Sequence, residues 1–352
     1  MLAAGLICHG RQAEEIGKRM DRRKFTRLGL QVLMTAGLGG GLLGGLSGCG
    51  EREGARGAEG RVPVKLGYLP ITDHLLMIGH GFYDFQKVAP QPVKFGAWPE
   101  AAEALRAGAI DAAFLLTPLG LTLRGQGSPI KAALLGHRNG SVLTVPVGDR
   151  VADVADLAGK TIAIPSRLST HYLLLRRLLA ERNMDPEAVR YLDMAPPEMV
   201  QALASGRIDG FIVAEPFGGQ AEIQQVGRVL ILSKDIWPGH ICCVLNIREE
   251  FIEKHPEAVQ ELVTGLTATG SFIEANRRQA AKRSVPYLGQ QPEVIEHVLT
   301  SPADRATYHD LVPARDDFGV TQELMERFGL SRRKVNLDGY LEPVFARRAK
   351  PL

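Results

Sequence analysis

The feature that most constrains the fold of this chain is a pattern that occurs twice, at 104–112 and at 202–210. Both copies read Ala-Leu-x-x-Gly-x-Ile-Asp followed by a small residue. In each copy a helical pattern ends at the glycine, which readily adopts a left-handed conformation, and an apolar strand pattern follows. Each of these strands ends in a residue followed by proline, at 117–118 and 215–216. The duplication predicts two similar lobes.

Strand-like and helix-like segments alternate from residue 61 to about residue 243, which predicts an α/β fold with mostly parallel sheets. A length of 352 residues suits about two domains at roughly 100–200 residues each. From about residue 251 onward the periodicity is helical, with no strand pattern, and we expect these helices to pack on the first lobe. We assign 62–143 and 244–352 to lobe 1, and 144–243 to lobe 2.

The N-terminal segment 1–49 has the features of an export signal, with a basic head, an apolar Gly-rich stretch at 28–48 and small residues before Cys49. Arg22-Arg23 resembles a twin-arginine (Tat) signal, and Leu-Ser-Gly-Cys at 46–49 resembles a bacterial lipobox, in which the cysteine is lipidated. An uncleaved membrane anchor over 28–48 is the alternative, and Met20 is an alternative start. The Gly-rich segment 50–61 predicts a flexible tether.

Charge and motif content exclude several functions. Lys and Arg total 42 against 39 Asp and Glu, and the basic excess lies in the first 48 residues, so nucleic acid is not an expected partner. The four cysteines match neither a disulfide framework nor a zinc pattern. We find no Ser/His/Asp arrangement, phosphate loop or His-Glu-x-x-His helix. We therefore expect no enzymatic activity, no cofactor and no metal.

Five stretches carry a resemblance to a known family, and they occur in the family's order at 64–73, 95–99, 108–113, 164–171 and 214–217. Together they resemble the solute-binding components of bacterial ABC importers, in the nitrate, sulfonate, taurine and bicarbonate branch. The resemblance implies a two-lobed type II periplasmic-binding-protein fold with a hinge and C-terminal helices. It also implies a receptor that closes over a solute and delivers it to an ABC permease and its ATPase. From the export signal and the lipobox we expect a lipid-anchored protein at the periplasmic or extracytoplasmic face of the membrane, and we expect a monomer.

The candidate ligand-binding residues lie after strands of the first lobe, and at a helix start and a strand end of the second, where an α/β cleft forms. They are Thr72, His74, Trp98, Thr117, Ser169, Thr170, His171 and Glu215. Ser-Thr-His at 169–171 looks like the nitrate and bicarbonate binders, whose histidine contacts the anion; a histidine that merely caps or packs is the alternative. Trp98 forms either an apolar wall for the ligand or a packed core aromatic.

The carboxylates near this cleft argue against a simple anion. We expect Asp73 to cap the helix that begins near His74, and its charge, like that of Glu215, would repel an anion. Unless the ligand is cationic, zwitterionic or metal-assisted, both carboxylates are structural or lock the hinge. The anion-pairing lysine of the family has no counterpart in the second lobe, which disfavours nitrate.

His240-Ile-Cys-Cys243 lies near the second crossing between the lobes. A soft-metal site with His171 is conceivable there. We favour the reading that Cys242 and Cys243 are small apolar residues of a strand, because adjacent residues of a strand point to opposite sides.

Two other functions stay open. The same fold is used by synthases of the pyrimidine precursor of thiamine, which resemble these binders and use a pocket histidine and iron-binding cysteines. Export and lipidation argue against a synthase, because its substrates are cytoplasmic, and binding of this precursor without synthesis belongs to the same alternative. A tethered ligand sensor that signals to a histidine kinase is the other. The solute itself is open among oxyanions, small organic sulfonates or carboxylates, and heterocyclic vitamin precursors.

Overall fold

The computed structural model describes residues 60–349. The predicted export signal, the lipobox with Cys49 and most of the predicted tether lie outside the described residues. Among the helices of 60–349, none is long and apolar enough to cross a membrane.

The first lobe is built on a five-stranded sheet with the strand order β2-β1-β3-β11-β4. β1 pairs in parallel with β2 and β3, whereas β11 is antiparallel to β3 and β4. The strands are β1 (Val62–Tyr68), β2 (Val88–Lys94), β3 (Ala112–Leu116), β4 (Ile130–Leu135) and β11 (Cys243–Arg248).

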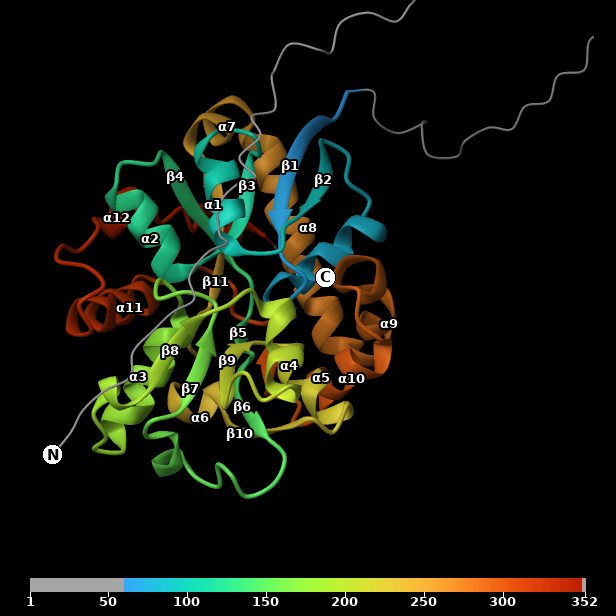
Figure 1. The fold of residues 1–352 in the computed structure, drawn as a ribbon. Coiled ribbons are helices and arrows are strands. Elements are labelled where there is room, and N and C mark those ends of the chain that lie inside the picture. The colour runs from blue at the N-terminus through green and yellow to red at the C-terminus, as the bar shows by residue number, and fades with distance from the viewer. Residues whose placement is uncertain (1–59, 350–352) are drawn as a thin grey trace, which may run out of the picture. The chain divides into compact units, whose positions relative to one another are not determined.

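The second lobe repeats this arrangement with the strand order β8-β7-β9-β6-β10. β7 is parallel to β8 and β9, and β6 is antiparallel to β9 and β10. The strands are β6 (Ser141–Pro146), β7 (Thr161–Ile164), β8 (Arg190–Asp193), β9 (Gly210–Ala214) and β10 (Gly227–Leu232). Figure 1 shows the first sheet in the upper half of the molecule and the second in the lower half. The predicted two-lobed α/β fold is confirmed.

The duplicated pattern makes the same contacts in both lobes. It covers the end of α1 (Trp98–Arg106) and the approach to β3, and the end of α4 (Pro196–Ala204) and the approach to β9. Asp111 accepts a hydrogen bond from the backbone N–H of Lys65 at 2.9 Å, and Asp209 accepts one from Thr161 at 2.9 Å. Each aspartate thus ties its own strand to the start of the neighbouring parallel strand.

The chain crosses between the sheets twice. The first crossing leaves β4, passes through β5 (Arg138–Asn139) and enters β6; the second leaves α6 (Ser233–Ile236) and enters β11. Each sheet therefore receives its antiparallel strand, β11 or β6, from the other lobe (Figure 1). Because β6 already begins at Ser141, the first crossing lies a few residues before the boundary that we predicted.

Helices cover both sheets. The first lobe carries η1 (Thr72–Gly81), α1, α2 (Thr117–Gly125), α7 (Glu249–Lys254), α8 (Pro256–Ala275), α9 (Arg277–Leu288) and α13 (Val344–Arg348). The second carries η2 (Val154–Leu157), α3 (Thr170–Glu181), η3 (Pro186–Ala188), α4, α5 (Phe217–Ile223) and α6. The remaining helices are α10 (Pro292–Thr300), α11 (Arg315–Arg327) and α12 (Leu337–Tyr340).

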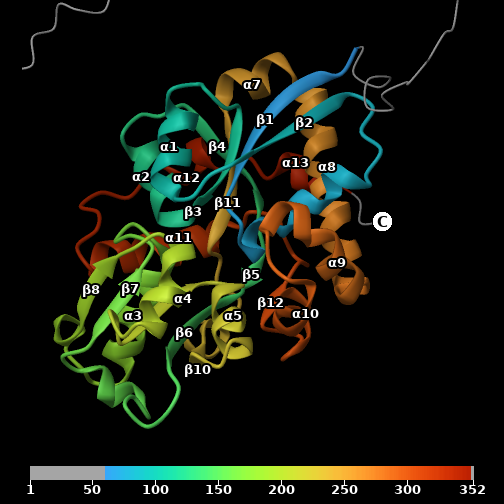
Figure 2. The same cartoon turned by 45° about the vertical axis from the view of Figure 1, so that its right-hand side comes forward.

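The prediction for the C-terminal part is wrong in two respects. A short strand, β12 (Ala306–Thr307), pairs with β5 of the first crossing, and α10 packs on α5 of the second lobe (Figure 2). The α5 contact is close because Gly219 has no side chain: a Cβ there would lie 2.5 Å from a methyl carbon of Val298. The C-terminal helices therefore contact both lobes.

The N-terminus of α3 is set by a serine cap. The Ser169 hydroxyl accepts a hydrogen bond from the backbone N–H of Tyr172 at 3.1 Å. Leucines of α3 then bury against the second sheet, and full burial of one such side chain stabilises the fold by roughly 1.5–3 kcal/mol. They are Leu174, Leu175, Leu178 and Leu179, each at most 2% exposed. The cap places His171 in the first turn of α3, facing the other lobe.

Candidate ligand-binding site between the lobes

Most of the predicted site residues meet in a buried group between the lobes, which we call the interlobe cluster. All of its members are at most 1% exposed. They are Thr72, Asp73, His74, Trp98, Thr117, His137, Ser141, Thr170, His171, Cys242 and Cys243. The first lobe, the second lobe and both crossings all contribute to it.

Asp73 lies on η1 and contacts both crossings. Its Oδ1 accepts a hydrogen bond from the backbone N–H of Cys243 at 3.2 Å, and its Oδ2 lies 3.2 Å from His137 Nε2. The prediction that Asp73 caps a helix is wrong: η1 begins at Thr72, after Ile71, with no side-chain cap. Asp73 therefore sits inside the first turn, and its carboxylate reaches the start of β11.

Electrostatics make Asp73 the ionised group of the cluster. Burial opposes ionisation, but the nearby charge of His137, with smaller attractions from His74 and His171, lowers the pKa of Asp73 to about 2. Burial lowers the pKa of His74 to about 3 and that of His171 to about 4, although Asp73 partly offsets both effects. At neutral pH these two imidazoles are uncharged and surround a carboxylate.

The two cysteines point into the same space. Cys242 precedes β11 and Cys243 is its first residue, so the alternation of a regular strand does not separate their side chains. Their Sγ atoms lie 4.0 Å apart. The sequence argument that adjacent cysteines face opposite sides is therefore wrong here. Burial raises the pKa of the Cys242 thiol to about 11 and that of Cys243 well above its usual range.

The backbone of Cys242 is held by both lobes. Its carbonyl accepts hydrogen bonds from the Thr117 N–H at 2.8 Å and the Thr117 hydroxyl at 2.9 Å. The Thr170 hydroxyl, from the second lobe, reaches the same carbonyl at 3.5 Å. Thr117 and Thr170, both predicted as ligand-binding residues, thus use their hydroxyls to position Cys242.

His171 and Trp98 approach each other across the interface. His171 Nε2 lies 3.0 Å from Ser141 Oγ and 3.6 Å from Cys242 Sγ. Trp98 is the first residue of α1, and its ring centroid lies 6.3 Å from that of His171 and 6.4 Å from that of His74. The tryptophan therefore packs between the lobes. Ser169 differs: its hydroxyl caps α3 and donates to the Ser166 carbonyl at 2.6 Å.

Several polar atoms of the cluster are buried with no hydrogen-bond partner among the described residues. They are Asp73 Oδ2, His74 Nε2, Trp98 Nε1, His137 Nδ1 and His171 Nδ1. Each such group costs roughly 1–3 kcal/mol, and folded proteins hold few of them. Their concentration at one interface indicates a place where a bound molecule or ion completes the hydrogen bonding.

Glu215, which we predicted as a ligand-binding residue, lies outside the cluster. Its Oε1 accepts a hydrogen bond from Arg305 Nε at 2.6 Å, and its Oε2 accepts one from the Gly219 N–H at 3.0 Å. Arg305 also binds Glu222 at 3.1 Å. Only the backbone carbonyl of Glu215 faces the first lobe, where it accepts from the Thr72 N–H at 2.7 Å.

Sequence reasoning missed His137 and Ser141, and it set the two cysteines aside. His137 and Ser141 flank the first crossing, and the cysteines end the second. A chain with two lobes must cross between them, and the crossing segments lie at the interface. Short polar segments between strand patterns could therefore have identified these residues in the sequence. His240, also in the second crossing, is buried with its Nε2 unpartnered among the described residues, and burial lowers its pKa to about 3.

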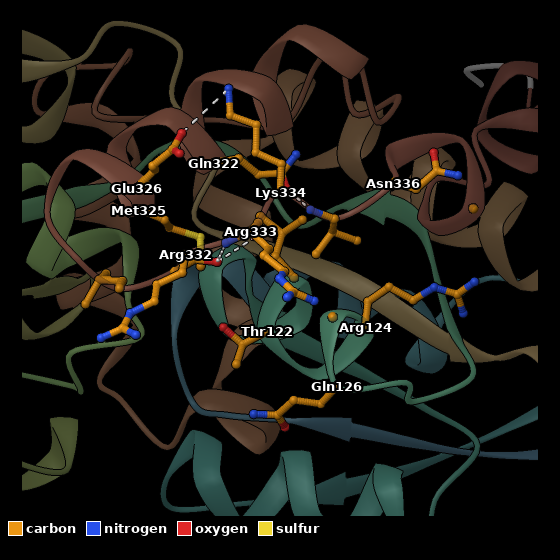
Figure 3. Close-up of a pocket in the computed structure, with 16 residues that line it drawn as sticks. Thr122, Arg124, Gln126, Gln322, Met325, Glu326, Arg332, Arg333, Lys334 and Asn336 are labelled. Atoms are coloured by element: carbon orange, nitrogen blue, oxygen red, sulfur yellow. Dashed lines mark hydrogen bonds and ion pairs between the residues drawn. The ribbon is translucent and has the colours of Figure 1, made fainter.

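A surface pocket of about 610 Å³ lies elsewhere, between α2 and α11 (Figure 3). Arg332, Arg333 and Lys334 line it from the segment after α11, and Arg124 lines it from α2. Arg124 is paired with Glu249 at 2.8 Å. No residue of the interlobe cluster lines this pocket.

Comparison with known proteins identifies the family. Residues 57–286 match the model of the NMT1-like family. The chain belongs to this family. The nitrate import ATP-binding protein NrtC of Synechocystis is 32% identical over 261 residues, which are 67% of this chain and 38% of that protein. The taurine-binding periplasmic protein of Escherichia coli is 31% identical over 170 residues, 47% of this chain and 52% of that protein.

A solved structure is similar over most of the described chain. The ligand-binding component of an ABC-type import system from Staphylococcus aureus, solved with zinc bound, is 30% identical with a TM-score of 0.76. The match covers 83% of this chain and all of that one. The predicted resemblance to importer solute-binding components is thus confirmed. This chain spans less than half the length of the first curated relatives that it matches.

Proposed function

We propose that this protein is the extracytoplasmic solute-binding component of an ABC importer, which captures a small solute between its lobes and delivers it to the permease. One observation carries the proposal: both lobes contribute buried, unpartnered polar atoms to a single interface. Such an interface is stable when a solute supplies the missing partners, so binding favours lobe closure. The family and the relatives named for binding support this reading.

The charge of the interlobe cluster narrows the solute class. The cluster holds one ionised carboxylate, Asp73, and among its eleven residues there is no lysine or arginine. A bare oxyanion would meet this negative charge without a basic partner. A heterocyclic or zwitterionic solute with N–H donors fits better, because Asp73 and the neutral imidazoles can accept its hydrogen bonds and Trp98 offers a flat apolar face.

In the proposed capture each lobe has a part. Asp73, His74 and Trp98 form the first lobe's surface, and His171 approaches from α3 of the second lobe. Closure removes water from these groups and strengthens each hydrogen bond to the solute. The cluster holds the solute and performs no bond-making. Export, lipidation of Cys49 and a monomeric state belong to the same proposal; labelled palmitate should enter the wild-type chain and not a Cys49→Ser variant.

The test is thermal unfolding of the purified chain with a panel of nitrate, bicarbonate, an alkanesulfonate and an aminopyrimidine. A solute at 100 times its Kd should stabilise the chain by roughly 2.7 kcal/mol. We expect the aminopyrimidine to give a larger shift than nitrate. Stabilisation by no member of the panel, or chemical turnover of the bound molecule, would contradict the proposal.

A further inference from the structure

We propose that the interlobe cluster contains a binding site for a thiophilic divalent metal ion, with zinc as the best match. Its ligands are Asp73, Cys242 and Cys243, with His171 as the fourth. The inference rests on the proposed function in one respect: the ion would occupy the same interface that we propose closes around a solute.

The positions of the donor atoms support this site. One carboxylate oxygen of Asp73 and the sulfurs of Cys242 and Cys243 all lie within 4.8 Å of one another. The two sulfurs are 4.0 Å apart, and His171 Nε2 is 3.6 Å from Cys242 Sγ. Tetrahedral zinc with bonds of about 2.0–2.3 Å places its donors roughly 3.3–3.8 Å apart. Asp73, Cys242 and Cys243 lie close to that geometry, whereas His171 is near Cys242 alone and has to move toward the other two donors.

A second observation independently points to a cation. Asp73 is fully buried, its nearest basic group is the ring of His137, 3.2 Å from Oδ2, and the cluster contains no lysine or arginine. The contacts of the carboxylate are the Cys243 N–H and the His137 ring. Burial of a carboxylate is costly when an imidazole, and not a lysine or arginine, is its basic partner. A bound metal ion would supply the positive charge at this point.

The donor types select the class of ion. Two sulfurs, one imidazole and one carboxylate suit zinc, whereas calcium and magnesium take oxygen ligands. The sulfurs would bind as thiolates and release their protons to solvent. Calcium and magnesium should therefore bind far more weakly than zinc.

The ligands come from both halves of the molecule. Asp73 belongs to η1 of the first lobe, the cysteines to the end of the second crossing, and His171 to α3 of the second lobe. An ion held by Asp73 and the cysteines can engage His171 only when the lobes meet. Ion binding is therefore coupled to closure.

The experiment titrates the metal-free, full-length chain with zinc chloride alone and, separately, with cobalt chloride as a spectroscopic probe. We expect one high-affinity zinc ion per chain and thiolate-to-cobalt charge-transfer absorption. A Cys242→Ser/Cys243→Ser variant should lose that absorption and bind zinc more than about 100-fold more weakly, since even outer-shell changes cost 10- to 100-fold. The matched control, Cys8→Ser/Cys49→Ser, should keep both properties.

Two single variants test the other ligands. Asp73→Asn and His171→Ala should each weaken zinc binding by more than about 10-fold. Their controls, Asp84→Asn and His309→Ala, change exposed residues and should bind like the wild type. If the double cysteine variant does not fold, the cobalt spectrum of the Cys8→Ser/Cys49→Ser chain decides, because its thiolates come only from Cys242 and Cys243.

The inference is overturned if the native chain does not bind zinc, or if loss of Cys242 and Cys243 leaves the zinc affinity unchanged. A chain that fails to bind zinc but is stabilised by an organic solute would remove the metal site and leave the proposed function intact. A chain that responds to neither would remove both.

Discussion

Asp73 and Glu215 are both fully buried carboxylates near the contact between the lobes, yet their surroundings differ. Glu215 has a fixed cation, Arg305, and a backbone N–H donor from Gly219. Asp73 has the Cys243 N–H and the ring of His137. Burial alone does not separate a structural carboxylate from one that binds a ligand. The difference is whether the fold itself supplies the compensating charge.

The strongest test of this contrast is Arg305→Ala, which leaves Glu215 and Glu222 without their shared cation. Removal of one partner from a buried ion pair costs about 3–5 kcal/mol, and we expect a loss of that size in the free energy of unfolding, measured by urea denaturation. The control Arg278→Ala breaks an exposed pair with Glu296 and should change stability little. Equal losses in the two variants would refute the structural role of the Arg305 network.

Gly140→Ala tests the surroundings of Asp73, because it displaces the ring of His137. Gly140 has φ +76°, and a Cβ there would lie 2.2 Å from Cε1 of His137. The left-handed backbone alone should cost about 1–2 kcal/mol of stability, and displacement of the His137 ring should also weaken ligand binding. Gly148→Ala is the control, because its φ of +94° is equally unusual but its Cβ meets nothing within 4 Å. Similar ligand affinities in the two variants would argue against a role for His137.

His171→Ala should act on binding more than on folding. We expect any solute that binds the wild type to lose about 1–3 kcal/mol of binding free energy, because a hydrogen bond to the ligand is lost. Calorimetric titration measures this loss, with the exposed His309→Ala as the control. If affinity is unchanged while stability falls, His171 is a packing residue.

The smallest expected effect comes from Trp98→Phe, which keeps an aromatic ring and removes the unpartnered indole N–H. The ligand affinity should fall by about 0.5–1.5 kcal/mol, the usual net value of one hydrogen bond. The melting temperature of the free chain should also fall, because Trp98 is 1% exposed and the smaller ring leaves a cavity. A lower melting temperature with unchanged ligand affinity would show that Trp98 only packs.

The fold was predictable because its determinants are local. The repeated Ile-Asp segments place an aspartate beside the start of the neighbouring strand in both lobes, and Ser169 caps α3 as its position suggests. The positions of Trp98 and His171 were also predictable from the sequence, because both residues lie at the starts of helices that converge between the lobes in such a fold.

The rest of the site depends on contacts between distant segments. Asp73 obeys no local capping rule, because its partner Cys243 is 170 residues away in the chain. The Glu215 carboxylate points away from the cluster because it accepts a hydrogen bond from Arg305, 90 residues later in the chain. The cysteine pair converges because regular strand pairing begins only at Cys243. Residue type and spacing do not encode any of these three contacts.

The Cys242 carbonyl offers a way to anticipate the motion of the two halves. Its contacts with Thr117 are shorter than the 3.5 Å contact with Thr170, so the Thr170 contact should break first when the halves rotate apart. The sulfurs of Cys242 and Cys243 would then stay beside Asp73 in the first lobe, and His171 would move away with the second lobe. An incoming ion would therefore first meet Asp73, Cys242 and Cys243 on one side of the open interface. The His171 imidazole would bind it last, as the two halves close.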